Sequence, residues 1–418
     1  MKSSNLLLIL ILNAGFKVGG MARTWQVGAG TACPTIHEGI EQANPGDTLF
    51  IQPGIYREGN IEIAKKLAIQ GIDWPVIDGE NKTEILTITV DSVTIEGLRI
   101  QNVGTNYLKD QAGIRGVRVK HLLIRNNRLM NTFFGIYLEH CSDVIVAGNH
   151  IEGSAIDEVS SGNAIHAWYC KLIQIEANQV SGHRDGIYFE FVDSSQICEN
   201  DSQQNLRYGL HFMFSNDDDY MQNRFELNGA GVAVMFSRRI VMRNNQFIEN
   251  WGSASYGLLL KEIYDGWIYL NRFDQNTIGV YSEGSNRILF EENIIHRNGW
   301  GVKIAGGCAD NLYRYNDFNL NTFDVTIPHN QPSITFQYNH WDQYQGYDLN
   351  HDGVGDVPFR PVKLYGYVVS RSPEAIVLLR SFLVDLLNYA EKVNPVATPL
   401  LVQDPTPLMH SKFKSPRP

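Results

Sequence analysis

A short pattern of alternating apolar residues recurs eight times between Phe134 and Asp324, and each copy begins with Gly or Ala. The copies start at Gly135, Ala164, Gly186, Gly209, Gly231, Gly257, Gly279 and Gly301. Successive starts are 29, 22, 23, 22, 26, 22 and 22 residues apart, which gives a period near 22. The second and fourth positions are mostly apolar and share one face of a strand, because side chains two apart point the same way. A period of this length, without a helical pattern between the strands, predicts a β-solenoid in which each repeat forms one strand–turn–strand coil.

Two columns of asparagine keep the same register as the apolar positions. The first column lies 14 residues after each start and consists of Asn149, Asn178, Asn200, Asn223, Asn245, Asn271 and Asn293. The second precedes the next coil and consists of Asn205, Asn228, Asn250, Asn276, Asn298 and Asn321. Asn tolerates the left-handed conformation of tight turns, and stacked amides can hydrogen-bond from coil to coil. We therefore predict an all-β protein, a right-handed parallel β-helix.

The regions before the repeats predict export and a capped solenoid. Residues 1–22 combine Lys2, an apolar run of seven residues and a small-residue cleavage site, which is typical of a signal peptide and too short to span a bilayer. The β-helix is expected over residues 23–345. Thr35 and Glu38 have capping-box spacing and predict a short helix at 35–43 that covers the first coil. The formal net charge of −10 argues against nucleic acid or an anionic membrane surface as a partner.

The outward positions of the repeated strand carry unusual residues for a solvated face. His166 and His211 occupy the third position of their strands, and Met213 and Met235 occupy the fifth position in adjacent coils. Thioether and imidazole ligands together suit Cu(I), which predicts a surface copper site made of His211, Met213 and Met235, with His166 farther along the same stripe. Met and aromatic residues also suit a protein-docking patch, and composition alone favours that alternative.

Two stacked cysteines allow two interpretations. Cys141 and Cys170 each lie six residues after the start of their repeat, so that their Cα atoms would be about 5 Å apart in neighbouring coils. This separation permits a disulfide in an exported protein. A pair of small, stacked apolar residues explains the same spacing and is the favoured interpretation.

The stretch 346–358 resembles a calcium-binding loop. Asp348, Asn350, Asp352 and Asp356 alternate around Gly353, as ligands do in D-x-[DN]-x-D-G loops. The twelfth-position Glu of an EF-hand is replaced by Phe359, so Asp356 would have to close the site. A Ca²⁺ site and an Asx-rich turn both remain open at this point.

Residues 359–418 are predicted to form one long helix and a Pro-rich tail. Ser372 and Pro373 suit the start of a helix, and Asn394-Pro395 would end it. Its apolar face is wider than a surface helix needs and predicts a partner-docking role. The docking residues are Ile376, Leu379, Phe382, Leu383 and Leu386. The alternative is a helix that caps the open end of the solenoid.

Longer stretches of the chain resemble the NosD family, the periplasmic β-helix proteins of the nitrous-oxide reductase maturation system. The matching stretches include GNAIHAWYC, SGHRDGIYFEF, NLRYGLHFMFSNDDD, NGAGVAVMFSRR, YGLLLKE, YDLNHDGVGDVPFRPVKL, LLRSFLVDLL and DPTPLM. The resemblance spans nearly the whole mature chain and includes His211, Met213 and Met235, which raises the copper interpretation above the docking one.

The resemblance implies a non-enzymatic, periplasmic protein that handles Cu(I) transiently. Its implied partners are the permease and ATPase of an ABC transporter, a copper chaperone lipoprotein as donor, and the nitrous-oxide reductase whose copper–sulfide centre receives the metal. Contact with the membrane would occur only through the permease.

The rival hypothesis is an exported carbohydrate-active β-helix enzyme of the lyase or epimerase type. Such chemistry needs paired carboxylates, or an acid with a basic residue, in one groove. His183, Asp185 and Glu190 are the residues that could serve it. The other outward acids, Glu139 and Glu283, stand two or more coils away, which weighs against an enzyme.

Overall fold

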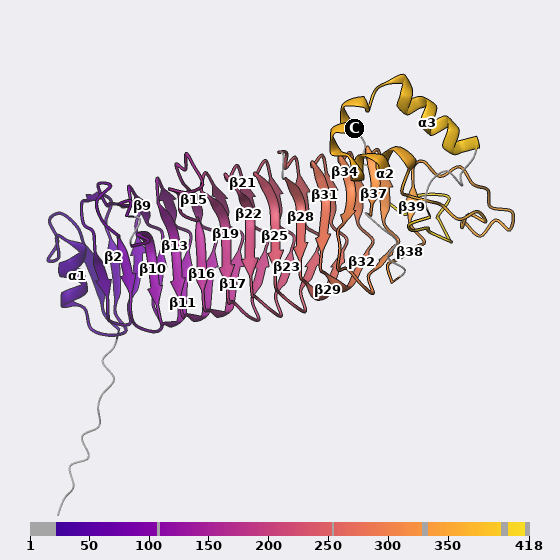
Figure 1. Ribbon diagram of the computed structural model, residues 1–418. Helices are drawn as coiled ribbons and strands as arrows, with labels where there is room; N and C mark the ends of the chain where they lie inside the picture. Colours follow the sequence, from indigo (N-terminus) through magenta and orange to yellow (C-terminus); the bar gives the residue numbers. More distant parts are fainter. Residues whose placement is uncertain (1–21, 107–108, 253–254, 328–332, 394–399, 414–418) are drawn as a thin grey trace, which may run out of the picture.

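The computed structural model describes residues 22–106, 109–252, 255–327, 333–393 and 400–413. Three long sheets of short parallel strands wind around one axis and form a single elongated solenoid (Figure 1). Its first strand begins at Thr24 and its last ends at Trp341. The right-handed parallel β-helix predicted from the repeats is confirmed. The unit is more complex than predicted, since each regular coil contributes three strands and not two.

We call the three sheets A, B and C. Each regular coil contributes one strand to each of them, first to sheet C, then to sheet A and then to sheet B. Sheet C contains β4 (Ile61–Ile63), β7 (Leu86–Ile88), β10 (Ala112–Val117), β13 (Phe134–Glu139), β16 (Ile165–Trp168), β19 (Asp185–Glu190), β22 (Tyr208–Met213), β25 (Ala230–Met235), β28 (Tyr256–Lys261), β31 (Ile278–Glu283), β34 (Trp300–Ile304) and β37 (Phe323–Thr326). This sheet is the eightfold repeat recognised in the sequence, extended by weaker copies at both ends.

The other two sheets complete the triangular coil. Sheet A contains β1 (Thr24–Val27), β2 (Thr48–Ile51), β5 (Ala68–Gly71), β8 (Thr94–Glu96), β11 (Lys120–Arg125), β14 (Ser142–Ala147), β17 (Lys171–Glu176), β20 (Gln196–Cys198), β23 (Asp219–Met221), β26 (Val241–Arg243), β29 (Tyr264–Tyr269), β32 (Asn286–Glu291), β35 (Leu312–Arg314) and β38 (Thr335–Gln337). Sheet B contains β3 (Ile55–Tyr56), β6 (Val76–Asp78), β9 (Arg99–Gln101), β12 (Arg128–Met130), β15 (His150–Glu152), β18 (Gln179–Ser181), β21 (Asp201–Gln203), β24 (Arg224–Glu226), β27 (Gln246–Ile248), β30 (Arg272–Asp274), β33 (Ile294–His296), β36 (Asp317–Asn319) and β39 (His340–Trp341).

The repeated glycine at the start of the sheet C strands is explained by the close approach of successive coils. A Cβ added at Gly231 would lie 2.4 Å from the carbonyl oxygen of Gly257, and one at Gly279 would lie 2.6 Å from that of Gly301. Real Cβ atoms do not approach backbone oxygen this closely. Most coils therefore carry glycine here because the next coil leaves no room for a side chain.

The first asparagine column forms a continuous buried ladder at the corner between sheets A and B. It runs through Asn127, Asn149, Asn178, Asn200, Asn223, Asn245, Asn271, Asn293, Asn316 and Asn339. Within the ladder, each Oδ1 accepts the backbone N–H and the side-chain amide of the residue one coil earlier, at 2.9–3.0 Å. These bonds satisfy buried polar groups that would otherwise be costly, and they fix the register between coils.

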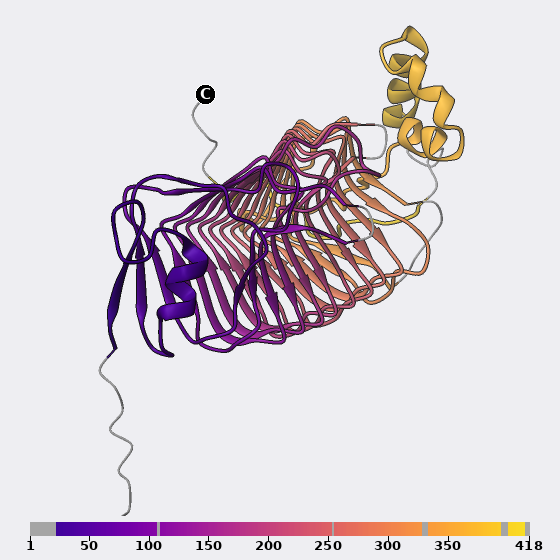
Figure 2. The same ribbon diagram turned by 90° about the vertical axis from the view of Figure 1, so that its left-hand side faces the viewer.

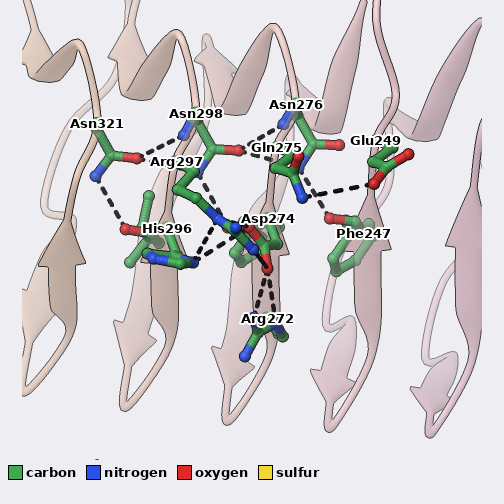
Figure 3. A network of polar contacts seen from close by, with 12 residues as sticks. Phe247, Glu249, Arg272, Asp274, Gln275, Asn276, His296, Arg297, Asn298 and Asn321 are labelled. Atoms are coloured by element: carbon green, nitrogen blue, oxygen red, sulfur yellow. Dashed lines mark hydrogen bonds and ion pairs between the residues drawn. The ribbon is translucent and has the colours of Figure 1, made fainter. Parts of the chain in front are cut away.

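The second asparagine column forms an equivalent ladder at the corner between sheets B and C. Figure 3 shows its members Asn276, Asn298 and Asn321 linked along the solenoid axis. Beside it, Asp274 accepts hydrogen bonds from Arg272 and from Arg297 of the next coil. Burial opposes ionisation of Asp274, but the two guanidinium groups outweigh it and lower the pKa of this carboxyl. This network therefore joins two coils outside the amide ladder.

The N-terminal end is closed by the helix that the sequence predicts. Helix α1 (Ile36–Gln42) lies across the first coil, and Thr35 caps it by accepting the backbone N–H of Glu38 at 3.2 Å. Two further N–H groups of the first turn find an acceptor elsewhere in the chain. The Glu58 carboxylate accepts the N–H groups of Ile36 and His37 at 2.9 and 3.1 Å.

The cysteines of the described structure are free thiols, and Cys141 and Cys170 stack in neighbouring coils as predicted. Both are buried, and the backbone N–H of Cys141 points at the Cys170 sulfur at 3.3 Å. The favoured interpretation of two stacked small residues agrees with this arrangement.

The long helix predicted at 373–394 is wrong in its extent. Two helical segments replace it, the 3-10 helix η1 (Pro373–Leu378) and α3 (Phe382–Val393), and a further helix, α2 (Leu364–Arg371), precedes them. The break at residues 379–381 follows from packing, because Leu379 turns into a small cluster with Tyr365 and Val384. Ser372 makes no side-chain cap bond, and Asn394 lies outside the described residues.

These helices form a projecting C-terminal arm, residues 360–403, between two segments that pair with each other. Phe359 and Asp404 exchange two backbone hydrogen bonds of 2.8 Å in an antiparallel bridge at the base of the arm. The helices stand beside the far end of the stacked coils in both views (Figures 1 and 2). None of the helices in the described ranges is long and apolar enough to cross a membrane.

The Pro-rich tail closes the C-terminal end of the solenoid after the arm. Asp404 is fully buried, and its Oδ2 accepts the backbone and side-chain N–H groups of Asn339 at 3.0 Å each. The same oxygen accepts the indole N–H of Trp341 at 3.1 Å. Asp404 therefore takes the place of the next asparagine and ends the first ladder, a role the sequence did not reveal.

Candidate functional site

Strands β22 and β25 place three of the candidate copper ligands side by side on the outer face of sheet C. Met213 ends β22 and pairs in register with Met235, which ends β25. His211 lies two residues before Met213, so both side chains emerge on the same face of the strand. The neighbour of His211 in the next coil is Ala233, which is fully buried.

His211 is more enclosed than the predicted surface site requires. Its side chain is only 5% exposed, because the rings of Tyr188 and Tyr208 lie 5.0 and 4.8 Å from the imidazole. Met213 and Met235 are half-buried. The arrangement is a histidine beneath the surface with two thioethers nearer to solvent, and the predicted surface Cu(I) site stays a prediction.

A buried ion pair holds the imidazole of His211 from one side. Asp185 is fully buried, and its carboxylate accepts hydrogen bonds from Nε and Nη2 of Arg207 at 3.0 and 2.6 Å. Nδ1 of His211 lies 3.6 Å from Oδ2 of Asp185 and 3.3 Å from Nη2 of Arg207. Burial opposes ionisation of Asp185, but hydrogen bonds from His211 and Arg207 outweigh it and lower the pKa of the carboxyl. Asp185 is therefore a carboxylate that can accept an Nδ1 proton.

The other ring nitrogen of His211 has no protein partner. Nε2 is buried and makes no hydrogen bond among the described residues. An unsatisfied buried polar atom costs about 1–3 kcal/mol. Arg207 Nη2 can donate to Nδ1 only when that nitrogen is unprotonated and the ring proton is on Nε2. In the other tautomer Nδ1 directs its proton at Asp185, 3.6 Å away, and the Nε2 lone pair is free for a metal. Metal-binding histidines commonly have such a carboxylate partner. These residues therefore fit a Cu(I) ion bound by one imidazole nitrogen and two thioethers.

His166 lies two coils from His211 and Met213, and three from Met235, and is enclosed by rings. Tyr137 stacks on it at 4.4 Å and Tyr188 at 4.7 Å, and the side chain is 9% exposed. Burial, with the positive charge of Arg184, lowers the pKa of His166 to about 3, so the imidazole stays neutral at physiological pH. Tyr188 separates it from His211 by a full coil. His166 is therefore not part of the His211 cluster, and its role as a second copper station stays a prediction.

Asp185 and Arg207 support the site and were not assigned to it from the sequence. Asp185 directly precedes the Gly start of its repeat, where the five following coils have other residues. Those residues are Tyr208, Ala230, Tyr256, Ile278 and Trp300. A lone acid in a row of apolar and aromatic residues is the signal that could have revealed it.

The residues of the rival enzyme hypothesis are each engaged elsewhere. His183 is buried between the Thr132 hydroxyl at 3.1 Å and the Ser181 carbonyl at 2.9 Å. Asp185 is fully buried against Arg207, and Glu190 accepts the Tyr188 hydroxyl at 3.3 Å. Of these three residues only Glu190 reaches solvent, and its hydrogen-bond partner is a tyrosine hydroxyl and not the basic residue that glycoside or uronate chemistry would require.

The four candidate calcium ligands share one turn, in which backbone amides already occupy most of their oxygens. The Asp348 carboxylate accepts the N–H groups of Asp352 and Gly353 at 3.2 and 2.9 Å. Asp352 accepts the Asn350 amide at 2.9 Å, and Asp356 accepts the Leu349 N–H at 2.7 Å. No group of three or more Asp, Glu, His or Cys side chains arranged to hold a metal occurs in the described part of the chain. These hydrogen bonds fold the four residues into one Asx-rich turn.

Calcium binding at Asp348, Asn350, Asp352 and Asp356 therefore stays a prediction with a direct test. An ion that binds only the folded state raises the melting temperature by mass action. Calcium should then raise the melting temperature of the chelator-treated protein, and Asp352→Ala should abolish the increase. If calcium leaves the melting temperature unchanged, the stretch is an Asx-rich turn alone.

The predicted docking residues lie on the C-terminal arm, and most of them face solvent. Phe382 is 80% exposed, Leu386 49%, Leu383 48% and Ile376 38%. Leu379 is the exception, because it packs against the cluster that joins α2 to α3. The arm therefore presents an apolar outer surface that nothing in the described chain covers.

Comparisons with known proteins agree with the family resemblance seen in the sequence. The family model "Periplasmic copper-binding protein (NosD)" matches residues 147–350. A protein of Pseudomonas aeruginosa, called a probable ABC transporter binding protein NosD, is 28% identical over 97% of this chain and 98% of its own. A protein of the same name from Stutzerimonas stutzeri is 26% identical over 91% of both chains.

Solved structures show the fold alone. A variant of the periplasmic alginate epimerase AlgG matches 70% of this chain and 76% of its own with a TM-score of 0.50 and 11% sequence identity. A likeness at this identity is one of β-helix architecture and carries no information about chemistry.

Three findings lead to one assignment, namely the whole-length similarity to proteins of one name, the matching family model and the shared β-helix. These findings support a NosD-family protein with a parallel β-helix fold.

Proposed function

We propose that this chain is a periplasmic accessory protein of nitrous-oxide reductase maturation, which receives Cu(I) and delivers it for assembly of the copper–sulfide centre while attached to an ABC transporter. The description of its family as periplasmic and copper-binding supports the compartment and the cargo. The names of its relatives, which refer to ABC transporter binding, support the transporter. Copper is cargo here and not a resident cofactor.

The observation that carries the proposal is the unpartnered Nε2 of His211 beside the register-paired Met213 and Met235. Imidazole and thioether donors suit Cu(I), whereas carboxylate and water suit harder ions. Thioethers are neutral and flexible, so a site built from them can bind and release an ion without backbone movement. Their half-buried position lets a partner protein reach the ion from outside.

The C-terminal arm is the part of the chain proposed to meet the transporter. Its outer apolar surface fits the permease, while the ATPase would associate through the permease. A copper chaperone lipoprotein would supply the ion and the reductase would receive it. Residues 1–22 would direct export, and contact with the membrane would occur only through the permease.

The proposal is tested by complementing a strain that lacks this chain with Met213→Ala/Met235→Ala. The variant should fold normally but leave the reductase without its copper–sulfide centre, because both soft ligands are lost. The measurements are the copper content and the visible absorption spectrum of the purified reductase. Met130→Ala removes a half-buried methionine from sheet B and serves as the matched control. A reductase that matures normally with the double variant would refute the copper site.

A further inference from the structure

A ladder of five stacked rings lies at the corner between sheets C and A, directly beside the thioether pair. The ring ladder consists of His140, Tyr169, Phe191, Phe214 and Phe236. Successive ring centroids are 5.2, 4.5, 5.0 and 5.1 Å apart, and the rings are nearly parallel, with interplanar angles of 18°, 15°, 9° and 12°. Each ring residue directly follows the last residue of a sheet C strand, so Phe214 follows Met213 and Phe236 follows Met235.

The backbone of the solenoid does not require rings at this corner. All five ring residues have the left-handed conformation, with φ between 51° and 55°. This conformation disfavours bulky side chains and suits Asn or Gly. Other corners of the same coils have the same conformation but no such row of rings. They carry Glu199, Gln204, Gln222, Leu227, Asn244 and Glu249. Among these corners, the row of rings is therefore confined to the one beside the candidate copper site.

The ladder is also open to solvent over several coils. Tyr169 is 46% exposed, Phe214 39% and Phe236 37%. Stacking contributes favourably to the fold, but it does not need the rings to be at the surface. The half-buried Met213 and Met235 directly precede Phe214 and Phe236 and extend this apolar surface, while Glu190 lies between Met213 and Trp168 in the same row. Aromatic residues and Met are enriched in the buried centres of protein interfaces.

The way the rings are exposed indicates what kind of partner fits them. Binding of a sugar to an aromatic side chain uses the open face of the ring. In the ladder, each inner ring face is covered by the next ring at 4.5–5.2 Å, so mainly the edges reach the surface. A row of rigid edges beside two thioethers suits the apolar side chains of a folded protein and not a polysaccharide.

We propose that the ring ladder, together with Met213 and Met235, is the surface on which a Cu(I)-carrying protein with an apolar contact face docks to exchange copper. This inference rests on the proposed function, because it assigns a partner surface to the same site. Rings at the rim would exclude water while the ion passes from the partner to the thioethers. Aromatic side chains lose little conformational entropy on binding, so they suit a brief encounter.

The test uses Phe214→Asn/Phe236→Asn in the full mature chain. Asn suits the left-handed backbone, so the variant should keep the fold. The probe is the Cu(I)-loaded soluble domain of the copper lipoprotein proposed above as donor. Rapid mixing gives the rate of copper transfer, and competition with a chromophoric chelator gives the equilibrium affinity for Cu(I). The transfer rate should fall on the order of tenfold while the affinity stays unchanged, as expected when interface anchors are removed.

Leu227→Asn and Leu270→Asn are matched controls, since both residues are exposed and left-handed but lie at other corners. They should transfer copper as fast as the wild type. An unchanged transfer rate in the double variant would show the ladder to be a structural stack and would overturn the inference. Ring-dependent binding of alginate oligosaccharides would overturn it in favour of a carbohydrate surface. A wild-type chain that binds no Cu(I) would instead refute the proposed function itself.

Discussion

Replacing Asp404 with alanine is expected to destabilise the C-terminal coils by about 3 kcal/mol or more, although the residue lies far from the candidate copper site. The carboxylate accepts three buried N–H groups, two from Asn339 and one from Trp341. Each buried donor left without an acceptor costs about 1–3 kcal/mol. In a solenoid each coil contacts only its neighbours, so the loss should appear first at the end of the stack. Hydrogen exchange of residues 333–341, measured by mass spectrometry, checks this directly.

Asp404→Asn is the matched control, because its side-chain oxygen can still accept those three donors. It loses only the bond that Asp404 Oδ1 accepts from the Thr406 N–H at 3.1 Å. Burial raises the pKa of Asp404, which means that ionisation of this carboxyl opposes folding as the pH rises through its native pKa. The amide removes that penalty. Similar protection of the C-terminal coils in the alanine variant and the wild type would contradict the capping role.

Excising the arm should abolish association with the transporter and leave the β-helix intact. The bridge between Phe359 and Asp404 closes the base of the arm, so residues 364–399 can be replaced by a short Gly-Ser linker without removing the cap. The expected result is a folded solenoid, less protected only where Phe323 of β37 loses its packing on the arm, that no longer co-purifies with the permease and ATPase. A simple truncation at residue 370 would remove Asp404 as well and would confound docking with destabilisation.

A double point variant tests whether the exposed apolar surface of the arm, and not only its folded helices, is needed for binding to the transporter. Phe382 is 80% exposed and Leu386 49%, so Phe382→Asp/Leu386→Asp should leave the helices folded while placing charges in the apolar surface. Loss of co-purification in both variants supports docking through this surface. Retention of the transporter by the excised protein would place the contact elsewhere, and unfolding of the excised protein would show the arm to be part of the cap.

The repeats allowed the solenoid to be predicted because its strands obey local rules. The inward second and fourth positions of the sheet C strands are mostly apolar, and both asparagine columns return at fixed positions, as the ladders require. The three-residue strands of sheet B are too short to show a period of their own, so the third strand of the coil was missed. The cap helix was visible because Thr35 and Glu38 lie within one turn of each other.

The C-terminal end was harder to predict because its interactions are long-range. Asp404 binds Asn339 across 65 residues of sequence, and nothing in the local DPTPLM stretch indicates this partner. Helix α2 contains Gly366, Val368 and Val369, whose weak helix propensity is overcome by packing on α3 and β37. The broad apolar pattern near residue 380 predicted helix correctly but not the break that tertiary packing introduces.

The candidate copper site likewise combines features that follow from local sequence with features that depend on contacts between coils. The positions of Met213, Met235 and His211 follow from strand register, and the sequence alone placed them together. Burial of His211 does not follow from register, since it depends on the rings of Tyr188 and Tyr208 folding over the strand. The pairing of Asp185 with Arg207 likewise crosses coils and became evident only from the structure.

X-ray absorption spectroscopy of the Cu(I)-loaded chain tests the central claim most directly. The account predicts a copper shell of thioether sulfur from Met213 and Met235 with one imidazole nitrogen from His211. The sulfur contribution should disappear in Met213→Ala/Met235→Ala and the imidazole contribution in His211→Ala, while Met130→Ala leaves the spectrum unchanged. A shell of oxygen and nitrogen only, or a sulfur shell that persists in the double methionine variant, would contradict the account.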